Sequence, residues 1–174
     1  QDGNTLSSGV IPAISGGGIF IDGSGSGNIA SPSISNCQFI ANDGYFGGAL
    51  YLYAVGGASH PNIDKCTFHD NDAHNGGALF IAAQSGGVSN PIINNSTFTS
   101  NEATAGGAIY TYALSGTSNP ALTSCTFYGN ISPSGLGGAL YNDAPSAGTC
   151  NPSLLNSILW NNGNAISNVN ANPT

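Results

Sequence analysis

The sequence predicts an all-β fold, a parallel β-helix of about five to six coils with three short strands per coil, in which residues 1–174 form a single domain. Two observations lead to this prediction: one motif recurs at a period of 29 to 32 residues, and its apolar positions alternate in short stretches. Repeats of this length that bury apolar side chains only against neighbouring repeats are typical of a solenoid.

The motif occurs five times. Each copy runs from a Pro through an Ile or Leu, a Cys or Ser and a Phe or Leu to an Asn, and in the first four copies a glycine pair and an apolar segment follow. The copies begin at Pro32, Pro61, Pro91, Pro120 and Pro152, and the glycine pairs begin at Gly47, Gly76, Gly106 and Gly137, with a further copy at Gly16. Glycine permits a positive φ or a close backbone approach, so we expect these pairs at sharp turns.

The residues of one copy favour strands over helices. The chain contains 26 Gly and 9 Pro, and it lacks runs of helix formers with apolar residues three and four positions apart. In the coil that begins at Pro61, we expect strands at 61–63, 66–68 and 77–81 and turns at 64–65, 71–75 and 82–90. Equivalent strands of successive coils would pair in parallel about 4.8 Å apart.

Stacking the copies aligns equivalent residues into columns, and three columns of large apolar side chains would form the walls of the core. They are Ile34, Ile63, Ile93, Leu122 and Leu154; Phe39, Phe68, Phe98, Phe127 and Leu159; and Ile19, Leu50, Leu79, Ile109, Leu140 and Ile166. A structural column of asparagines is formed by Asn42, Asn71, Asn101, Asn130 and Asn162. We expect it inside a turn, where the amides satisfy backbone groups and hydrogen-bond to the asparagines of neighbouring coils.

The F-x-x-N motif followed by G-G-A-I/L resembles the repeats of chlamydial polymorphic outer-membrane proteins, and over roughly residues 16–166 the chain is similar to bacterial right-handed parallel β-helix surface proteins. The resemblance implies a right-handed solenoid. Because this class includes adhesins, passenger domains and polysaccharide-active enzymes, it does not define the function. Within the domain, residues 16–166 hold the repeats, residues 1–15 are expected to form a partial coil or assembly segment, and residues 167–174 a polar tail.

The composition limits the partners. One basic residue and eight acidic residues give a formal net charge of −7. A phosphate-binding surface needs clustered Lys and Arg, so we expect no nucleic-acid binding and no attraction to an anionic membrane surface. No apolar run approaches the roughly 18 to 20 residues of a spanning helix, so we expect no membrane insertion.

The composition also indicates a location. The chain begins at Gln1 without a preceding signal sequence, which fits a mature secreted chain or a fragment of a longer protein. A weakly charged chain rich in Asn, Ser, Thr and Gly is typical of secreted bacterial surface proteins. We therefore expect an extracellular or cell-surface location.

Four cysteines are present. Cys37, Cys66 and Cys125 share one inward column with Ser96 and Ser157, which favours inert buried thiols at a tight turn. Cys37 and Cys66 belong to adjacent coils, at a separation that also permits a disulfide. Cys150 lies in another column, and the absence of a Cys-x-x-Cys spacing argues against a zinc site.

Acidic residues form a short column of their own. Asp43, Asp72 and Glu102 directly follow the asparagines and would stack one coil apart. Because stacked like charges repel, the side chains either extend into water or hold a cation between them, so Ca²⁺ is the one cofactor that the pattern suggests. Glycoside hydrolysis would need two carboxyl groups about 5 to 9.5 Å apart, and a lyase would need a base such as Lys65; we expect neither activity and assign no catalytic residue.

Aromatic residues occupy the outward positions of the strand after each glycine pair. They form a ladder of Phe20, Tyr51, Phe80, Tyr110 and Tyr141 and a partial second row of Tyr53 and Tyr112. Contiguous exposed aromatics mark interaction surfaces. Glycans, a neighbouring protein or loops of the same chain are the three expected partners of this face.

These expectations favour a non-catalytic, secreted structural protein. Neither 1–15 nor 167–174 carries a charged or helical cap, so copies of the chain are expected to stack head to tail into an extracellular filament or surface layer. The alternative is a glycan- or host-binding adhesin segment of a larger surface protein, in which neighbouring coils of the longer chain continue the solenoid. A polysaccharide-active enzyme is the third hypothesis.

Overall fold

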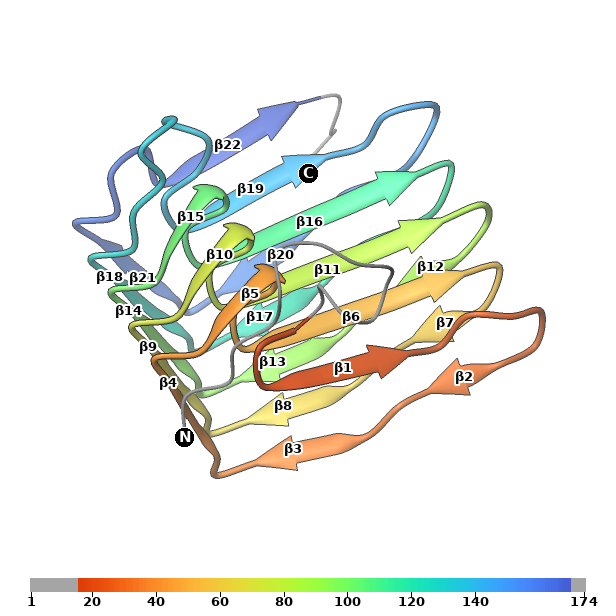
Figure 1. The fold of residues 1–174 in the computed structure, drawn as a ribbon, viewed down its shortest axis with the longest axis horizontal. Helices are drawn as coiled ribbons and strands as arrows, with labels where there is room; N and C mark the ends of the chain where they lie inside the picture. Colours follow the sequence, from red (N-terminus) through yellow and green to blue (C-terminus); the bar gives the residue numbers. More distant parts are fainter. Residues whose placement is uncertain (1–15, 170–174) are drawn as a thin grey trace.

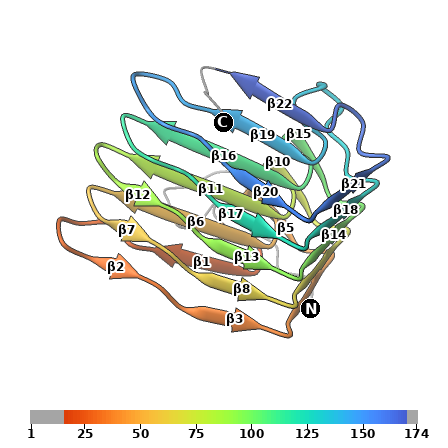
Figure 2. The same ribbon diagram turned by 180° about the vertical axis from the view of Figure 1, so that it is seen from behind.

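The structure is a computed structural model that describes residues 16–169, and these residues fold into a parallel β-solenoid without helices (Figure 1). Equivalent strands of successive coils lie side by side, from β1 (Ile19–Asp22) at one end to β22 (Ile166–Val169) at the other (Figure 2). The predicted all-β parallel solenoid is therefore confirmed.

Five parallel sheets form the walls. The long sheet contains β1, β6 (Leu50–Val55), β11 (Leu79–Gln84), β16 (Ile109–Leu114), β19 (Leu140–Asp143) and β22. The base sheet contains β3 (Ser33–Ser35), β8 (Asn62–Asp64), β13 (Ile92–Asn94), β17 (Ala121–Thr123) and β20 (Ser153–Leu155). The side sheet contains β4 (Gln38–Ile40), β9 (Thr67–His69), β14 (Thr97–Thr99), β18 (Thr126–Tyr128) and β21 (Ile158–Trp160).

Two smaller sheets complete the coil. The corner sheet contains β2 (Ile29–Ala30), β7 (Ala58–Ser59) and β12 (Val88–Ser89), and the cover sheet contains β5 (Asp43–Phe46), β10 (Asp72–Asn75) and β15 (Glu102–Ala105). A complete coil thus holds five short strands, where three were predicted. The additional strands lie in the predicted turns 71–75 and 82–90.

The strand β10 forms because its side chains alternate between the two faces. Ala73 is buried, whereas Asp72 and His74 are exposed, so a small inward side chain lets the backbone lie against the adjacent coils. At the end of the chain, residues 167–169 belong to β22 and not to the predicted polar tail. The predicted assembly segment 1–15 lies outside the described residues.

Single residues with a left-handed backbone make the corners. Between the base and side sheets they are Asn36, Lys65, Asn95, Ser124 and Asn156, with φ between 50° and 55°. Asn is the commonest of them, and its short polar side chain tolerates this conformation. At the corner before the long sheet, Gly47 has a φ of 62°, and a Cβ on the next glycine, Gly48, would lie only 2.3 Å from the carbonyl oxygen of Gly77. The first glycine therefore supplies the turn and the second supplies space.

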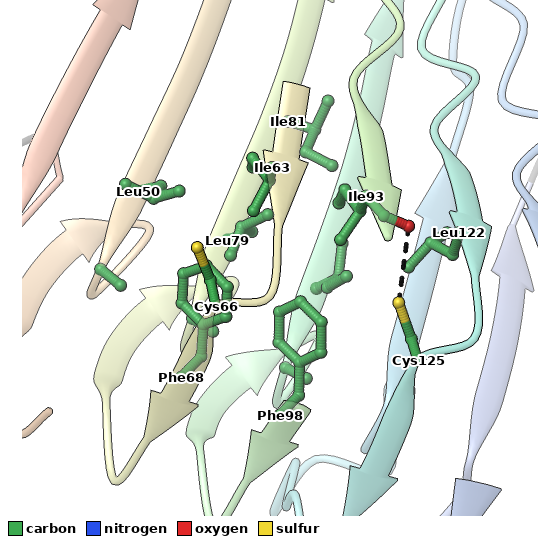
Figure 3. Packing of buried hydrophobic residues seen from close by; sticks show 14 of the residues in the cluster. Leu50, Ile63, Cys66, Phe68, Leu79, Ile81, Ile93, Phe98, Leu122 and Cys125 are labelled. Carbon is green, nitrogen blue, oxygen red and sulfur yellow. Dashed lines mark hydrogen bonds between the residues drawn. The ribbon is translucent and has the colours of Figure 1, made fainter. Parts of the chain in front are cut away.

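The three predicted apolar walls meet inside the solenoid (Figure 3). The rings of Phe68, Phe98 and Phe127 stack along the axis, with centroids 4.7 Å apart and planes that differ by 5°. Ile63 of the base sheet and Leu79 of the long sheet are fully buried against this stack. The packed interior holds the outer surfaces in fixed register from coil to coil.

Candidate functional site

The five asparagines of the predicted column lie where the chain passes from the side sheet into the cover sheet, and they form a continuous hydrogen-bonded ladder. At each step the Nδ2 of one asparagine donates to the Oδ1 of the asparagine in the next coil, at 2.8 Å. The same Oδ1 accepts the backbone N–H of the first asparagine, at 3.0 to 3.1 Å. The Nδ2 atoms also donate to phenylalanine carbonyls of the preceding coil, for example from Asn101 to Phe68 at 3.1 Å. This column holds the coils together and is buried, so it is not open to a ligand.

The aromatic ladder on the long sheet is mostly buried by the same chain, which is one of the three kinds of covering expected for this face. The members are in register from coil to coil, in the order Phe20, Tyr51, Phe80, Tyr110 and Tyr141. Tyr51, Phe80, Tyr110 and Tyr141 are at most 8% exposed, and only Phe20, Tyr53 and Tyr112 are half-buried. A face with so little open ring area cannot act as a flat platform.

The cover sheet and the loop after it contribute to this burial. Phe46, Ala105 and Leu136 each precede a glycine pair and pack on the aromatic rings from outside. The ring of Phe46 stacks on Phe80 with centroids 4.9 Å apart. The sequence contained a signal for this contact, because the residue before the glycine pair is apolar in three of the four copies. Because 71–75 was interpreted as a turn, this contact was not predicted.

A groove is present where the cover is interrupted. Asn75 occupies the position that Phe46 and Ala105 hold in the neighbouring coils. The groove has a volume of about 330 Å³ and is lined by aromatic side chains and by the amides of Asn75 and Gln84. None of the described residues that line it is charged, so it fits a neutral ligand with an apolar face.

The tyrosines around the groove are hydrogen-bond donors. Burial raises the pKa of Tyr51 and of Tyr110 far above the ordinary value for a phenol, and the nearby acids Asp22 and Asp143 act in the same direction. The hydroxyl of Tyr110 donates to Oδ2 of Asp143 at 3.3 Å. As protonated phenols, these side chains can donate hydrogen bonds to a polar ligand.

The acidic column lies on the outer face of the cover sheet. The register pairs Asp72 with Asp43 on one side and with Glu102 on the other. Partial burial raises the pKa of Asp72, and the charges of Glu102 and Asp43 raise it further. Within residues 16–169, no three His, Cys, Asp or Glu side chains are grouped so that they could hold a metal ion. A calcium ion between these carboxylates, the alternative to their extension into water, stays a prediction.

The groups beside the acidic column are held by neighbouring coils. The ring of His74 stacks on Tyr45, with centroids 4.8 Å apart, and its Nδ1 lies 3.5 Å from Oγ1 of Thr104. Together with Asp43 and Asp72 these side chains line a shallow groove of about 390 Å³. Lys65, the residue considered for lyase chemistry, lies elsewhere and pairs with Asp64 at 3.5 Å between Nζ and Oδ2.

All four cysteines are free thiols, so the predicted disulfide between Cys37 and Cys66 is not formed. The Cys37 thiol donates to the carbonyl of Ser35 at 3.3 Å, and the Cys66 thiol donates to the carbonyl of Asp64 at 3.4 Å. In the same column the hydroxyl of Ser96 donates to the carbonyl two residues earlier, at 2.8 Å. Cys and Ser exchange here because both make this turn contact. The Cys125 thiol also donates to the carbonyl of Ile93 (Figure 3). Burial raises the pKa of Cys66 and of Cys125, and it raises the pKa of Cys150 to about 11.

The two end coils differ in how they expose the core walls. Among the described residues, the strands β20, β21 and β22 each pair with one other strand. At this end Leu154 and Leu159 are half-buried and Ile166 is exposed. At the other end, Ile34 and Phe39 begin the same two columns as Leu154 and Leu159, and both are only 8% exposed. Two of the three core walls are therefore open at the C-terminal end alone.

The outer face of the last coil is also apolar, at positions where the earlier coils are mainly polar. The column that ends in Leu155 begins with Ser35, Asp64, Asn94 and Thr123. The column that ends in Ile158 begins with Gln38, Thr67, Thr97 and Thr126. Trp160 follows Ile40, His69, Thr99 and Tyr128 in a third column.

These three side chains, Leu155, Ile158 and Trp160, are 59%, 62% and 68% exposed. We call this outward-facing apolar surface of the last described coil the end surface. The segment 144–169 holds no charged residue. An exposed apolar surface of this kind marks an interaction site.

Comparison with known families agrees with the fold. The chain matches the family described as a right handed beta helix region over residues 2–174, and it therefore belongs to this family. The structure thus belongs to a right-handed β-helix repeat protein. No curated protein and no solved structure matches the chain. Among the described residues there is no helix long and apolar enough to cross a membrane.

Proposed function

We propose that this β-helix domain is a non-catalytic structural module of a secreted or cell-surface protein and that it self-associates through its C-terminal coil. The observation that carries the proposal is the end surface, which is apolar and uncharged and faces outward from the coil. The low charge of the chain and the resemblance of its repeats to those of chlamydial polymorphic outer-membrane proteins support a surface role. The presence of a single basic residue counts against chemistry on acidic polysaccharides.

Apolar burial offsets part of the cost of an association of this kind. Burial of a large apolar side chain contributes about 1.5 to 3 kcal/mol, and a contact between two apolar surfaces would bury Leu155, Ile158 and Trp160 on at least one of them. Association costs about 4 to 15 kcal/mol in lost freedom.

The test is the molar mass of the purified 174-residue chain over a wide range of concentration. Light scattering after size-exclusion chromatography should show a mass above that of the 17.3 kDa monomer, and electron microscopy should show any extended assembly. A monomer mass that persists to the highest soluble concentration would contradict self-association.

The groove at Asn75 favours a second candidate function, binding of a neutral glycan. Aromatic rings can contact the apolar face of a sugar, and the amides of Asn75 and Gln84 can pair with its hydroxyl groups. Calorimetric titration with neutral oligosaccharides tests this candidate. Tyr112→Ala should abolish the heat of binding, whereas Tyr128→Ala, on the side sheet away from the groove, should leave it unchanged.

A further inference from the structure

We infer that the groove at Asn75 accepts uncharged glycans and rejects acidic ones, and that Asp22 and Asp143, one on each side of the groove, determine this selectivity. This inference rests on the second candidate function, glycan binding at the groove. It adds the residues that decide which glycans can bind.

The groove follows the strand β11, which lies between β6 and β16 (Figure 1). Phe80 and Gln84 both line it, and they lie four residues apart on β11, about 13 Å at the rise of a β-strand. Its sides come from the neighbouring strands, with Tyr51 on β6 and Tyr112 on β16. A ligand that fills the groove therefore lies along β11 and across the axis of the solenoid.

The cover sheet prevents the ligand from lying along the axis instead. Phe46 and Ala105 occupy the positions on either side of Asn75 in this sheet. Both pack on the aromatic rings beneath them, and the ring of Phe46 stacks on Phe80. A glycan that ran along the solenoid axis would have to displace these contacts in the adjacent coils.

A column of the long sheet that crosses the groove carries an acid on each side. The register gives the order Asp22, Tyr53, Ala82, Tyr112 and Asp143, one residue per coil. Ala82 belongs to β11, so each acid lies two strands away from the strand beneath the ligand, at about 10 Å. On one side the carboxylate of Asp143 also accepts the hydrogen bond of Tyr110, whose ring lines the groove.

These charges act on an acidic ligand without a compensating cation. Lys65 is the only lysine or arginine of the chain, and it lies at the corner between the base and side sheets. In water, a like charge about 10 Å away weakens binding about twofold, so two acids weaken it about fourfold, and more where the protein lowers the dielectric constant. A neutral sugar avoids this repulsion and keeps its contacts with the aromatic rings and the amides.

An array of oligosaccharides printed in matched pairs tests the inference. In each pair the acidic member differs from the neutral one only by oxidation of hydroxymethyl groups to carboxylates, as in glucose and glucuronate. At low salt the chain should bind neutral members, and calorimetric titration should show that the acidic counterpart binds at least about fourfold more weakly. High salt should reduce this ratio, because it screens the charges.

Removal of the two carboxylates should remove the discrimination. A double variant with Asp22→Asn and Asp143→Asn keeps the side-chain oxygens that accept from Ser24 and Tyr110, and it should make the two dissociation constants nearly equal. Each single variant should remove about half of the effect on a logarithmic scale. Asp64→Asn, on the base sheet, removes the same charge away from the groove and should leave the ratio unchanged. Circular dichroism verifies that each variant is folded.

The results separate the inference from the candidate function on which it rests. Equal binding of neutral and acidic members, or a preference for acidic ones, would overturn the selectivity and leave glycan binding in place. A preference for neutral members that persists in the double variant would overturn the role of the two acids. A chain that binds no member of the array would overturn glycan binding at the groove, and the inference with it, and would leave the proposed self-association in place.

Discussion

Asn42, Asn71 and Asn101 are followed directly by Asp43, Asp72 and Glu102, so two polar columns run side by side along the solenoid, one residue apart. The amides point inward and are buried, whereas the acids lie on the outer face of the cover sheet. A central amide donates to both neighbouring coils and accepts from one of them: Asn101 donates to Phe68 and to Asn130 and accepts from the backbone and side chain of Asn71. The carboxylates can only accept, and the pKa of Asp72 is raised between two like charges.

The difference shows what a solenoid requires of a repeated polar residue. An amide carries a donor and an acceptor, so identical copies stacked about one strand spacing apart satisfy one another. An ionised carboxylate has no donor, so identical copies repel unless a proton or a cation separates them. The inward column can therefore be buried at little cost, and the acidic column must stay in contact with water.

The largest expected effect is that of exchanging an amide for a carboxylate in the buried column. Asn101→Asp replaces the Nδ2 group that donates to Phe68 and Asn130 by an oxygen that faces their oxygen atoms. Burial of an unpaired charge should cost about 4 kcal/mol or more of unfolding free energy at pH 7. Urea unfolding measures the loss.

Acidification distinguishes charge from shape at this position. At a pH low enough to protonate the new carboxyl group, a donor returns and most of the lost stability should be recovered relative to the unsubstituted chain. Asn101→Leu, which removes the Oδ1 that accepts from the backbone N–H and the Nδ2 of Asn71 at every pH, is the control and should show no recovery. A loss below about 1 kcal/mol for both variants would contradict a structural role of the column.

The next prediction concerns the column of phenylalanines, whose backbone carbonyls accept hydrogen bonds from the asparagine amides. Phe98→Ala should cost about 3 to 5 kcal/mol, because the stacked Phe68 and Phe127 prevent collapse of the cavity. Leu159→Ala, in the half-buried last member of the same column, should cost clearly less. Thermal and urea unfolding of the two variants compare a fully buried position with a half-buried one. Equal losses of unfolding free energy would contradict the difference in burial between the central and last coils.

The columns themselves could be predicted from the sequence, because period and alternation determine register. Fourteen of the sixteen residues assigned to the core walls belong to or pack against the buried core, all but Ile19 and Ile166, and the equivalent residues Ile63, Ile93 and Leu122 pair in adjacent coils. The surroundings of the outward positions could not be predicted. Tyr51 faces outward from the long sheet, but its burial depends on Phe46, which lies on another sheet.

The end surface shows the same limit. The apolar identities of Leu155, Ile158 and Trp160 could be read from the repeats, since earlier copies are mostly polar at these positions. That the first coil would have buried wall residues, and that the two ends would therefore differ, could not be predicted from sequence periodicity. Repeats predict each coil from its neighbours, and the end coils lack one neighbour.

A smaller effect is expected when the reverse exchange is made in the acidic column. Asp72→Asn removes the central charge and places an amide between Asp43 and Glu102, which should raise the unfolding free energy by about 0.5 to 1 kcal/mol at pH 7 and low salt. Asp43→Asn, at the end of the column, relieves repulsion from one neighbour only and should have about half the effect. A decrease in stability for Asp72→Asn would instead indicate that the carboxylate binds a cation, and added Ca²⁺ should then stabilise only the unsubstituted chain.

The smallest effect is the pH dependence that Asp72 contributes. Its pKa is raised in the folded state, so the folded chain binds this proton more tightly than the unfolded chain, in which the pKa is about 3.9. The contribution to stability is thus complete below the unfolded pKa and is lost as the pH rises through the folded pKa. The unfolding free energy of the unsubstituted chain minus that of Asp72→Asn separates this contribution from that of the other acids. As the pH falls from 7 toward 4, this difference should become more positive. A difference that is constant over this range would mean that Asp72 titrates alike in the folded and unfolded chains, and that the acidic column is as well solvated as isolated carboxylates.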